Sequence, residues 1–171
     1  MRRLTFALWV LALTPALAFA QNTESRRDQY YLFVAPGGAT SLFSSSGSTT
    51  GTLHFGGGGE GFVYKGLGIG AEVGFLAPVK SFRSGSGLVS VDGSYHFISS
   101  DKTKKVVPFI TGGYSLLFGS GAANGVNFGG GVNWWMRDRL GLRLEARDHI
   151  FPVGGGATPQ AWEVRIGFSF R

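Results

Sequence analysis

The feature that most constrains the fold is a two-residue alternation close to the C-terminus. In residues 140–147, leucine or alanine occupies each even position, and glycine or a charged residue occupies each odd position. Residues 162–170 repeat the pattern, with large apolar residues at even positions opposite Glu163, Arg165, a glycine and a serine. Successive side chains of a β-strand point to opposite faces, so both segments are predicted strands with one apolar and one polar face. This pattern alone fits either a soluble sandwich with a buried apolar face or a membrane barrel with the apolar face outside.

Six further segments have strand character, which makes eight in total. Most of the eight have ten to twelve residues, a length that suits a tilted barrel strand, which needs about 9–11 residues to cross a bilayer, whereas ordinary strands have about 5 or 6. The alternation is weakest in the first two segments, and no helical periodicity stands out beyond residue 20. We expect strands at residues 30–39, 52–64, 67–77, 88–98, 107–118, 125–135, 140–150 and 162–170.

The first twenty residues have the pattern of a secretory signal peptide. Two arginines precede the apolar run 4–13, and Ala18-Phe19-Ala20 supplies an A-x-A cleavage site. A membrane anchor is the competing interpretation, but the run is shorter than the roughly 20 apolar residues of a spanning helix. We therefore predict a signal peptide at 1–20 and one domain at 21–171. The sequence has no cysteine, so neither a disulfide nor a lipoprotein signal is expected.

Composition and the content of the polar faces favour the barrel over the sandwich. The chain has 29 glycines and 15% charged residues, against a usual charged share of roughly 25%. The charges of the strands lie on faces that are otherwise glycine and serine, as expected where opposite walls of a narrow barrel interdigitate. Arginine can satisfy two carboxylates and stays charged when poorly hydrated. We predict a polar network that plugs the lumen, formed by Glu60, Glu72, Asp92, Arg143, Glu145, Arg147, Glu163 and Arg165.

The connections predict the orientation of such a barrel. Residues 65–66, 99–106 and 136–139 would be periplasmic turns, and 40–51, 78–87, 119–124 and 151–161 would be outer loops, in line with the short-inside, long-outside rule. An even strand number returns both chain ends to one side, and closure removes the free edges that lipid does not tolerate. The aromatic residues predict two girdles: Tyr64, Tyr95, Phe97, Trp134, Phe168 and Phe170 at the inner end, and Phe55, Phe75, Phe118, Phe151 and Trp162 at the outer end.

With its signal peptide, eight alternating segments and a last strand ending in Phe168-Ser169-Phe170, the chain resembles the small outer-membrane barrels of the OmpA and OmpX type, or opacity-like proteins. The resemblance covers residues 21–171. It implies an all-β fold, an eight-stranded antiparallel up-and-down transmembrane β-barrel in the bacterial outer membrane. It also implies contact with membrane lipids, a monomer, and recognition of the last strand by the outer-membrane assembly machinery. Arg171 departs from the usual aromatic C-terminal residue.

Little in the sequence indicates catalysis or ligand binding. The glycine runs at 56–59 and 66–70 open no helix and lack a following Gly-Lys-Ser/Thr, so a phosphate loop is not expected. His54, His96 and His149 lie on different strands without paired ligand spacing, so we predict no metal site and no cofactor. Nucleic acid is not an expected partner of an exported chain, despite the formal charge of +6.

Three classes of function remain open. We favour a structural or interaction barrel with a side-chain-filled lumen and no catalytic residues. The alternative is a narrow channel or transporter for small or apolar solutes. About eight strands leave an interior only wide enough for side chains, which argues against general diffusion, but the glycine-rich walls leave some space for a narrow path. A lipid A-modifying enzyme is the third class, since His149 lies near the outer rim. Its parity points it inward and no His-x-Ser motif accompanies it, so no enzyme activity is expected.

Overall fold

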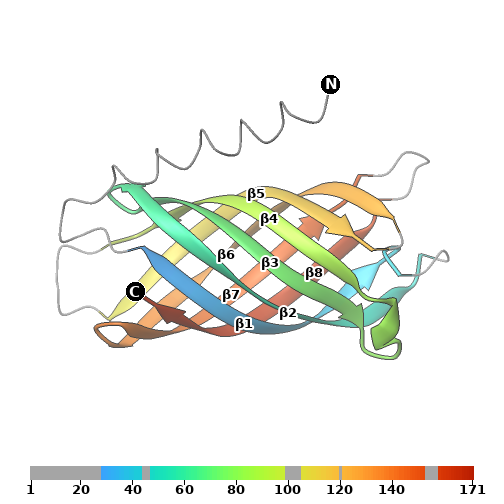
Figure 1. The fold of residues 1–171 in the computed structure, drawn as a ribbon, viewed down its shortest axis with the longest axis horizontal. Coiled ribbons are helices and arrows are strands. Elements are labelled where there is room, and N and C mark those ends of the chain that lie inside the picture. Colours follow the sequence, from blue (N-terminus) through green and yellow to red (C-terminus); the bar gives the residue numbers. More distant parts are fainter. Residues whose placement is uncertain (1–27, 44–46, 99–104, 120, 153–157) are drawn as a thin grey trace, which may run out of the picture.

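The protein is a closed eight-stranded barrel. The computed structural model describes residues 28–43, 47–98, 105–119, 121–152 and 158–171, and the expected signal peptide lies outside them. Every strand is antiparallel to its neighbours, in chain order, and β1 closes the barrel on β8 (Figure 1). This confirms the predicted fold class. The strands are β1 (Gln29–Thr40), β2 (Thr49–Tyr64), β3 (Leu67–Pro78), β4 (Ser86–His96), β5 (Val106–Phe118), β6 (Ala122–Arg137), β7 (Leu140–Ile150) and β8 (Gln160–Phe170).

The two ends of the barrel differ in their connections. Figure 1 shows the start of β1 and the C-terminus at one end, which we call the terminal end, and the short helix η2 (Phe82–Ser84) at the other, which we call the loop end. At the terminal end, β2 and β3 are joined by a two-residue turn, in which Lys65 and Gly66 have φ of 29° and 89°. Glycine adopts positive φ without steric cost, which suits Gly66 to this tight turn.

Strand bounds differ from the prediction mainly at the loop end. Strand β2 begins at Thr49 instead of residue 52, and β6 begins at Ala122 instead of residue 125. These added residues are small or polar and resemble loop residues in sequence, but their main chains pair with the neighbouring strand. Strand β4 ends at His96, so Phe97 and Ile98 lie beyond the strand in which they were predicted.

The outer surface of the barrel is apolar and exposed. Along β8, for example, Trp162, Val164, Ile166 and Phe168 are each about half exposed, while the residues between them are buried. Ala77 also points outward but is fully buried, because its side chain lies close to the position of Gly85, which follows η2. The exposed belt includes Tyr30, Leu32, Val34, Ile69, Val73, Val91, Ile110, Val126, Phe128, Leu144, Val164 and Ile166.

Inside the barrel, the loop end is closed by an apolar cluster that we call the plug. Its buried members continue the inward-facing series of several strands: Leu88 is two residues before Ser90, and Leu117 is two residues after Ser115. Phe151 is fully buried and stacks on His149, with ring centroids 6.3 Å apart. The expectation that Phe151 belongs to the outer girdle is therefore wrong. The plug consists of Ala39, Leu76, Leu88, Leu117, Phe151 and Ala161, with Leu42, Phe43 and Ala123 against it.

Candidate functional site

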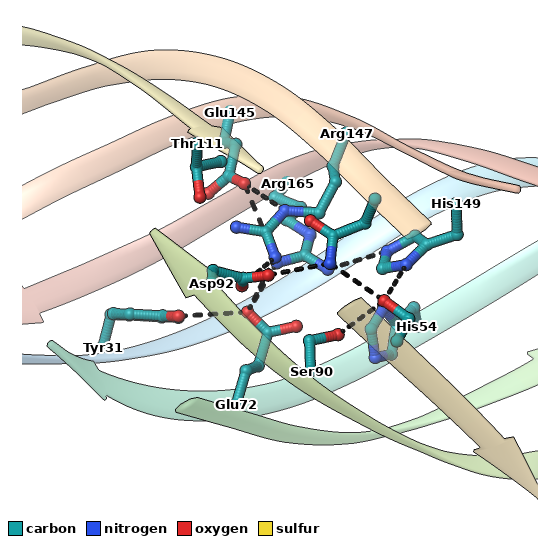
Figure 2. Close-up of polar contacts among 12 residues, drawn as sticks. Tyr31, His54, Glu72, Ser90, Asp92, Thr111, Glu145, Arg147, His149 and Arg165 are labelled. Carbon is teal, nitrogen blue, oxygen red and sulfur yellow. Dashed lines mark hydrogen bonds and ion pairs between the residues drawn. The ribbon is translucent and has the colours of Figure 1, made fainter. Parts of the chain in front are cut away.

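The middle of the lumen holds a network of buried charges. Figure 2 shows side chains from opposite walls pointing toward one another, with Glu72 of β3 and Asp92 of β4 facing Arg147 of β7 and Arg165 of β8. Each of these four side chains is at least nine-tenths buried. Buried charges are tolerated in protein only when they are paired and hydrogen-bonded, so the geometry of each arginine matters.

Arg165 lies at the centre of this network and is 1% exposed. Its Nη1 donates a hydrogen bond to Oε2 of Glu72 at 2.6 Å, its Nε donates to Glu163, and its Nη2 lies 3.3 Å from Nε2 of His149. The guanidinium carbon is 4.3 Å from the centroid of the Phe33 ring. One side chain thus connects β1, β3, β7 and β8 across the lumen.

The two arginines of β7 share one carboxylate. Arg143 and Arg147 each donate through Nε to Glu145, which lies between them on the same face of the strand. Arg147 also donates through Nη1 to Oδ2 of Asp92 at 2.7 Å. Arg143 instead lies over aromatic rings, with its guanidinium carbon 3.9 Å from the centroid of Phe109. The network therefore combines ion pairs with cation–π contacts.

Two histidines belong to the network, and sequence reasoning did not assign them to it. Nδ1 of His54 is 2.9 Å from Oε2 of Glu163. Because Arg165 is a donor, its contact with Nε2 of His149 requires that nitrogen to be the acceptor. Nδ1 of His149 then carries the hydrogen and donates to Oγ of Ser115 at 3.0 Å.

The hydroxyl of Ser115 connects His149 to Asp92 through Asn127. It also accepts a hydrogen bond from Nδ2 of Asn127 at 2.9 Å, and lies 2.9 Å from Oγ of Ser90. Asn127 in turn donates to Oδ1 of Asp92 at 2.7 Å. With both acceptor positions used, the Ser115 hydroxyl donates to Ser90. The middle of the lumen thus contains one continuous polar network.

Glu60 does not pair with an arginine, contrary to the prediction. Its carboxylate accepts a hydrogen bond from Nε2 of Gln29 at 2.6 Å and lies 3.0 Å from Nε2 of His96. This separate cluster is at the terminal end, where His96 stacks on Phe109. The position of a residue along the barrel axis depends on strand stagger, which the inward parity of Glu60 does not reveal.

Strand β1 lines the network with aromatic side chains. The sequence of β1 is apolar on both faces because Tyr31, Phe33 and Ala35 point inward while Tyr30, Leu32 and Val34 face outward. The hydroxyl of Tyr31 donates to Oε2 of Glu72 at 3.1 Å. The opposing residues of β2 are glycines: a Cβ on Gly58 would lie 2.7 Å from the Tyr31 hydroxyl. The glycine run 56–59 thus provides space for side chains.

Among the described residues, three arginines face four carboxylates in the central network, with Glu60 apart. Several buried atoms have no protein partner: His54 Nε2, Glu72 Oε1, Ser94 Oγ, Asn127 Oδ1, Asn133 Nδ2, Arg143 Nη1 and Asp148 Oδ1. Buried water satisfies such groups in most proteins. Within the described part of the chain, no group of three or more potential ligands is arranged to hold a metal ion, and no helix is long and apolar enough to cross a membrane.

The terminal end of the lumen opens into a small pocket. His96 and Gln29 line its polar part, Phe62 and Trp135 line its aromatic part, and Ile98 and Val107 contribute apolar wall. Arg171 lies at its edge, with its guanidinium carbon 4.0 Å from the centroid of the Trp135 ring. Among the described residues, this pocket borders the lumen at the terminal end, and the plug borders it at the loop end.

Comparison with known proteins shows similarity in fold but not in sequence. No protein-family model matches the chain, and no curated protein matches it. Among solved structures, neisserial surface protein A superimposes with a TM-score of 0.65 at 15% identity, over 84% of this chain and 96% of that one. The N-terminal β-barrel domain of OprF from Pseudomonas aeruginosa gives 0.57 at 15% identity, over 84% and 98%. Ail, the attachment invasion locus protein of Yersinia pestis, gives 0.54 at 11% identity, over 84% and 97%.

These similarities establish the fold: the chain is built as a small eight-stranded outer-membrane β-barrel, as the resemblance in sequence implied. A de novo designed transmembrane β-barrel also matches, with a TM-score of 0.54 at 16% identity, over 83% of this chain and 93% of that one. Because a designed barrel shares the fold, the fold alone does not identify an activity. The belt of exposed apolar residues would be unfavourable in water over so large an area. Together, belt and fold locate the protein in the outer membrane.

Proposed function

We propose that this outer-membrane protein is a closed structural or interaction barrel that stabilises the envelope and presents its loops outward, without catalysis. The observation that carries the proposal is the filling of the lumen. The central network spans the barrel from wall to wall, and the plug buries Leu88 and Phe151 at the loop end. A solute would have to displace both layers to pass.

Conductance in a planar bilayer tests this proposal directly. We expect the purified protein to insert and to pass little or no ion current. A large, steady conductance would contradict the closed barrel and would favour a narrow channel. That second candidate is supported by the pocket at the terminal end and by unpartnered polar atoms such as His54 Nε2 and Arg143 Nη1. In a channel of this kind the plug would have to move.

The proposed absence of catalysis rests on access. Ser115, His149 and Glu163 have a superficial likeness to a catalytic triad, with Nε2 of His149 3.6 Å from Oε1 of Glu163. However, Ser115 and His149 are fully buried, and the Ser115 hydroxyl already contacts Ser90 and Asn127. Release of fatty acid from lipopolysaccharide by the purified protein, lost in a His149→Ala variant, would overturn this part of the proposal.

The remaining partners follow from the same proposal: lipids of the outer membrane around a monomer, and the assembly machinery at the last strand. The side chain of Phe170 stays exposed on the outside, while Arg171 turns toward Trp135 at the mouth of the lumen. This arrangement supports recognition of Phe170 despite the extra C-terminal residue. Phe170→Ala should lower the amount of folded protein in the outer membrane, and deletion of Arg171 should not.

A further inference from the structure

The terminal end carries exposed cationic side chains that contact no carboxylate of the described residues. We call Lys65, Lys105, Arg137 and Arg139 the collar. They belong to three separate segments, the β2–β3 turn, the residue before β5, and the end of β6 with its turn into β7. Because these segments are distributed around the barrel, the cations form a partial ring and not a patch on one side. A ring matches a surface that surrounds the barrel, as a membrane leaflet does.

The collar lies directly beyond the exposed aromatic residues of the same end. Lys65 follows Tyr64, which is 56% exposed, and its Nζ is 5.3 Å from the centroid of the Tyr64 ring. The main-chain oxygen of Lys105 accepts a hydrogen bond from the amide of Trp135, next to the exposed Trp134. Tryptophan and tyrosine favour the depth of the lipid headgroups, and long basic side chains extend from there to the membrane surface. The collar is therefore at the depth of lipid phosphates.

The loop end lacks this arrangement. Its described connections carry two cations, Lys80 and Arg83, both on the β3–β4 connection that contains η2. Its lipid-facing side instead includes Asp148, whose Oδ2 accepts a hydrogen bond from Nε2 of Gln160 at 2.6 Å. Among the described residues at the terminal end, the collar outnumbers the exposed acids Asp28 and Asp138. The positive charge is thus concentrated at one end of the barrel.

We propose that the collar binds the phosphate groups of anionic glycerophospholipids and concentrates these lipids around the terminal end of the barrel. The inference rests on the proposed membrane function, since it needs the aromatic girdle to lie in a bilayer. Each basic residue near an anionic membrane surface strengthens binding to that surface about fivefold. Four such residues should therefore produce a clear local excess of phosphatidylglycerol over phosphatidylcholine.

The tryptophans allow a test at each end of the same molecule. After removal of residues 1–20, the chain contains Trp134, Trp135 and Trp162. A Trp162→Phe variant, which retains Trp134 and Trp135, reports on the terminal end, and a Trp134→Phe, Trp135→Phe double variant, which retains Trp162, reports on the loop end. Each variant is folded into vesicles of phosphatidylcholine and phosphatidylglycerol. Two preparations are compared: in one the phosphatidylglycerol carries bromine on its acyl chains, and in the other an equal mole fraction of brominated phosphatidylcholine is present instead. Bromine quenches the fluorescence of a neighbouring tryptophan.

We expect brominated phosphatidylglycerol to quench the fluorescence of the Trp162→Phe protein at least about twofold more than brominated phosphatidylcholine does. The effect is smaller than the roughly fivefold preference of each basic residue, because quenching averages over all lipids around the tryptophan. The preference should disappear at high salt and when all four collar residues are glutamine. A Lys80→Gln, Arg83→Gln control should retain it. The proposal would be contradicted if the two brominated lipids quenched Trp134 equally. It would also be contradicted if Trp162 showed the same preference for phosphatidylglycerol as Trp134.

Folding is measured separately in the same samples. The heat-dependent shift in gel mobility reports whether each variant has folded in phosphatidylcholine alone. Unmodified protein that fails to fold in any vesicle would contradict the membrane function itself. If the collar variant does not fold, the salt dependence of quenching in the unmodified protein decides the question, because salt screens exposed charges without altering the chain.

Discussion

Replacement of Arg165 by methionine tests whether the charged network stabilises the barrel. Methionine keeps an unbranched apolar stem but removes the donors to Glu72, Glu163 and His149. Breaking a buried ion pair costs about 3–5 kcal/mol, because a charge remains without its partner. Tyr31 would still donate to Glu72, and His54 would remain within reach of Glu163. We therefore expect a loss near the lower limit, about 3 kcal/mol in the free energy of unfolding.

Urea unfolding of the protein in lipid vesicles, followed by tryptophan fluorescence and gel mobility, measures this loss. A double-mutant cycle with Glu72→Gln isolates the direct interaction, because the neutral amide no longer requires a counter-charge. The two substitutions should be less damaging together than the sum of their separate effects, with a coupling energy of about 1–3 kcal/mol. Arg137→Met, at an exposed position, is the matched control and, in phosphatidylcholine vesicles without anionic lipid, should change stability by less than about 0.5 kcal/mol.

The reasoning would be refuted if Arg165→Met resembled Arg137→Met and showed no coupling to Glu72. Such a result would mean that water penetrates the middle of the lumen and screens its charges, since exposed ion pairs contribute only about 0–1 kcal/mol. It would also weaken the closed barrel, because a hydrated centre could conduct ions. Bilayer recordings on the same variant would then show whether ion current accompanies the hydration.

Three further changes address the plug, the wall and the lipid-facing surface. Leu88→Asn should raise single-channel conductance above that of the unmodified protein, because it places a polar group in the plug; unchanged current would exclude the plug as the barrier. Gly113→Ala should destabilise the barrel by more than about 1 kcal/mol, because its Cβ would lie 2.6 Å from Oδ1 of Asp92 and 2.7 Å from its Cα. Gly93→Ala, where the nearest such atom is 3.9 Å away, is the control and should be neutral in urea unfolding. Ile166→Arg should cost about 2–4 kcal/mol in the same assay if β8 crosses the bilayer centre there, and Phe170→Arg only about 0–1 near the interface; equal costs would contradict this depth.

The fold could be predicted from the sequence because successive residues of a barrel strand point alternately into the lumen and toward the lipid. Leu144 faces outward and Arg143 inward, and each strand repeats the same choice. Strand ends were less predictable. The residues that extend β2, Thr49 and Thr50, contribute main-chain pairing, which small polar side chains do not reveal. The apolar character of Phe97 continues the alternation of β4 beyond His96, the last residue of the strand, which explains why Phe97 was predicted to belong to it.

Individual contacts in the lumen could not be predicted to the same degree. Inward parity was available for Glu72 and Arg165, but these residues are 93 positions apart, and only barrel closure and stagger determine that they meet. The histidines were ambiguous because His54 and His149 fit a lumen or a rim equally well in sequence. The plug did leave a signal in the sequence. Leu116 and Leu117 are consecutive apolar residues of β5, so the strand is apolar on its inner face as well as its outer face at this point, where a polar inner face was expected.

The distribution of charges between strands has a consequence for the order of assembly. All three network arginines are on β7 and β8, the last strands to be synthesised, whereas Glu72 and Asp92 are on β3 and β4. The cross-lumen bonds can therefore form only when the final hairpin joins the rest. Until that step, both sets of charges are best kept in water, which opposes early transfer of an open sheet into lipid. A chain truncated before β8 would retain Glu72 without Arg165. The unpaired charge would make insertion of an incomplete barrel into lipid unfavourable.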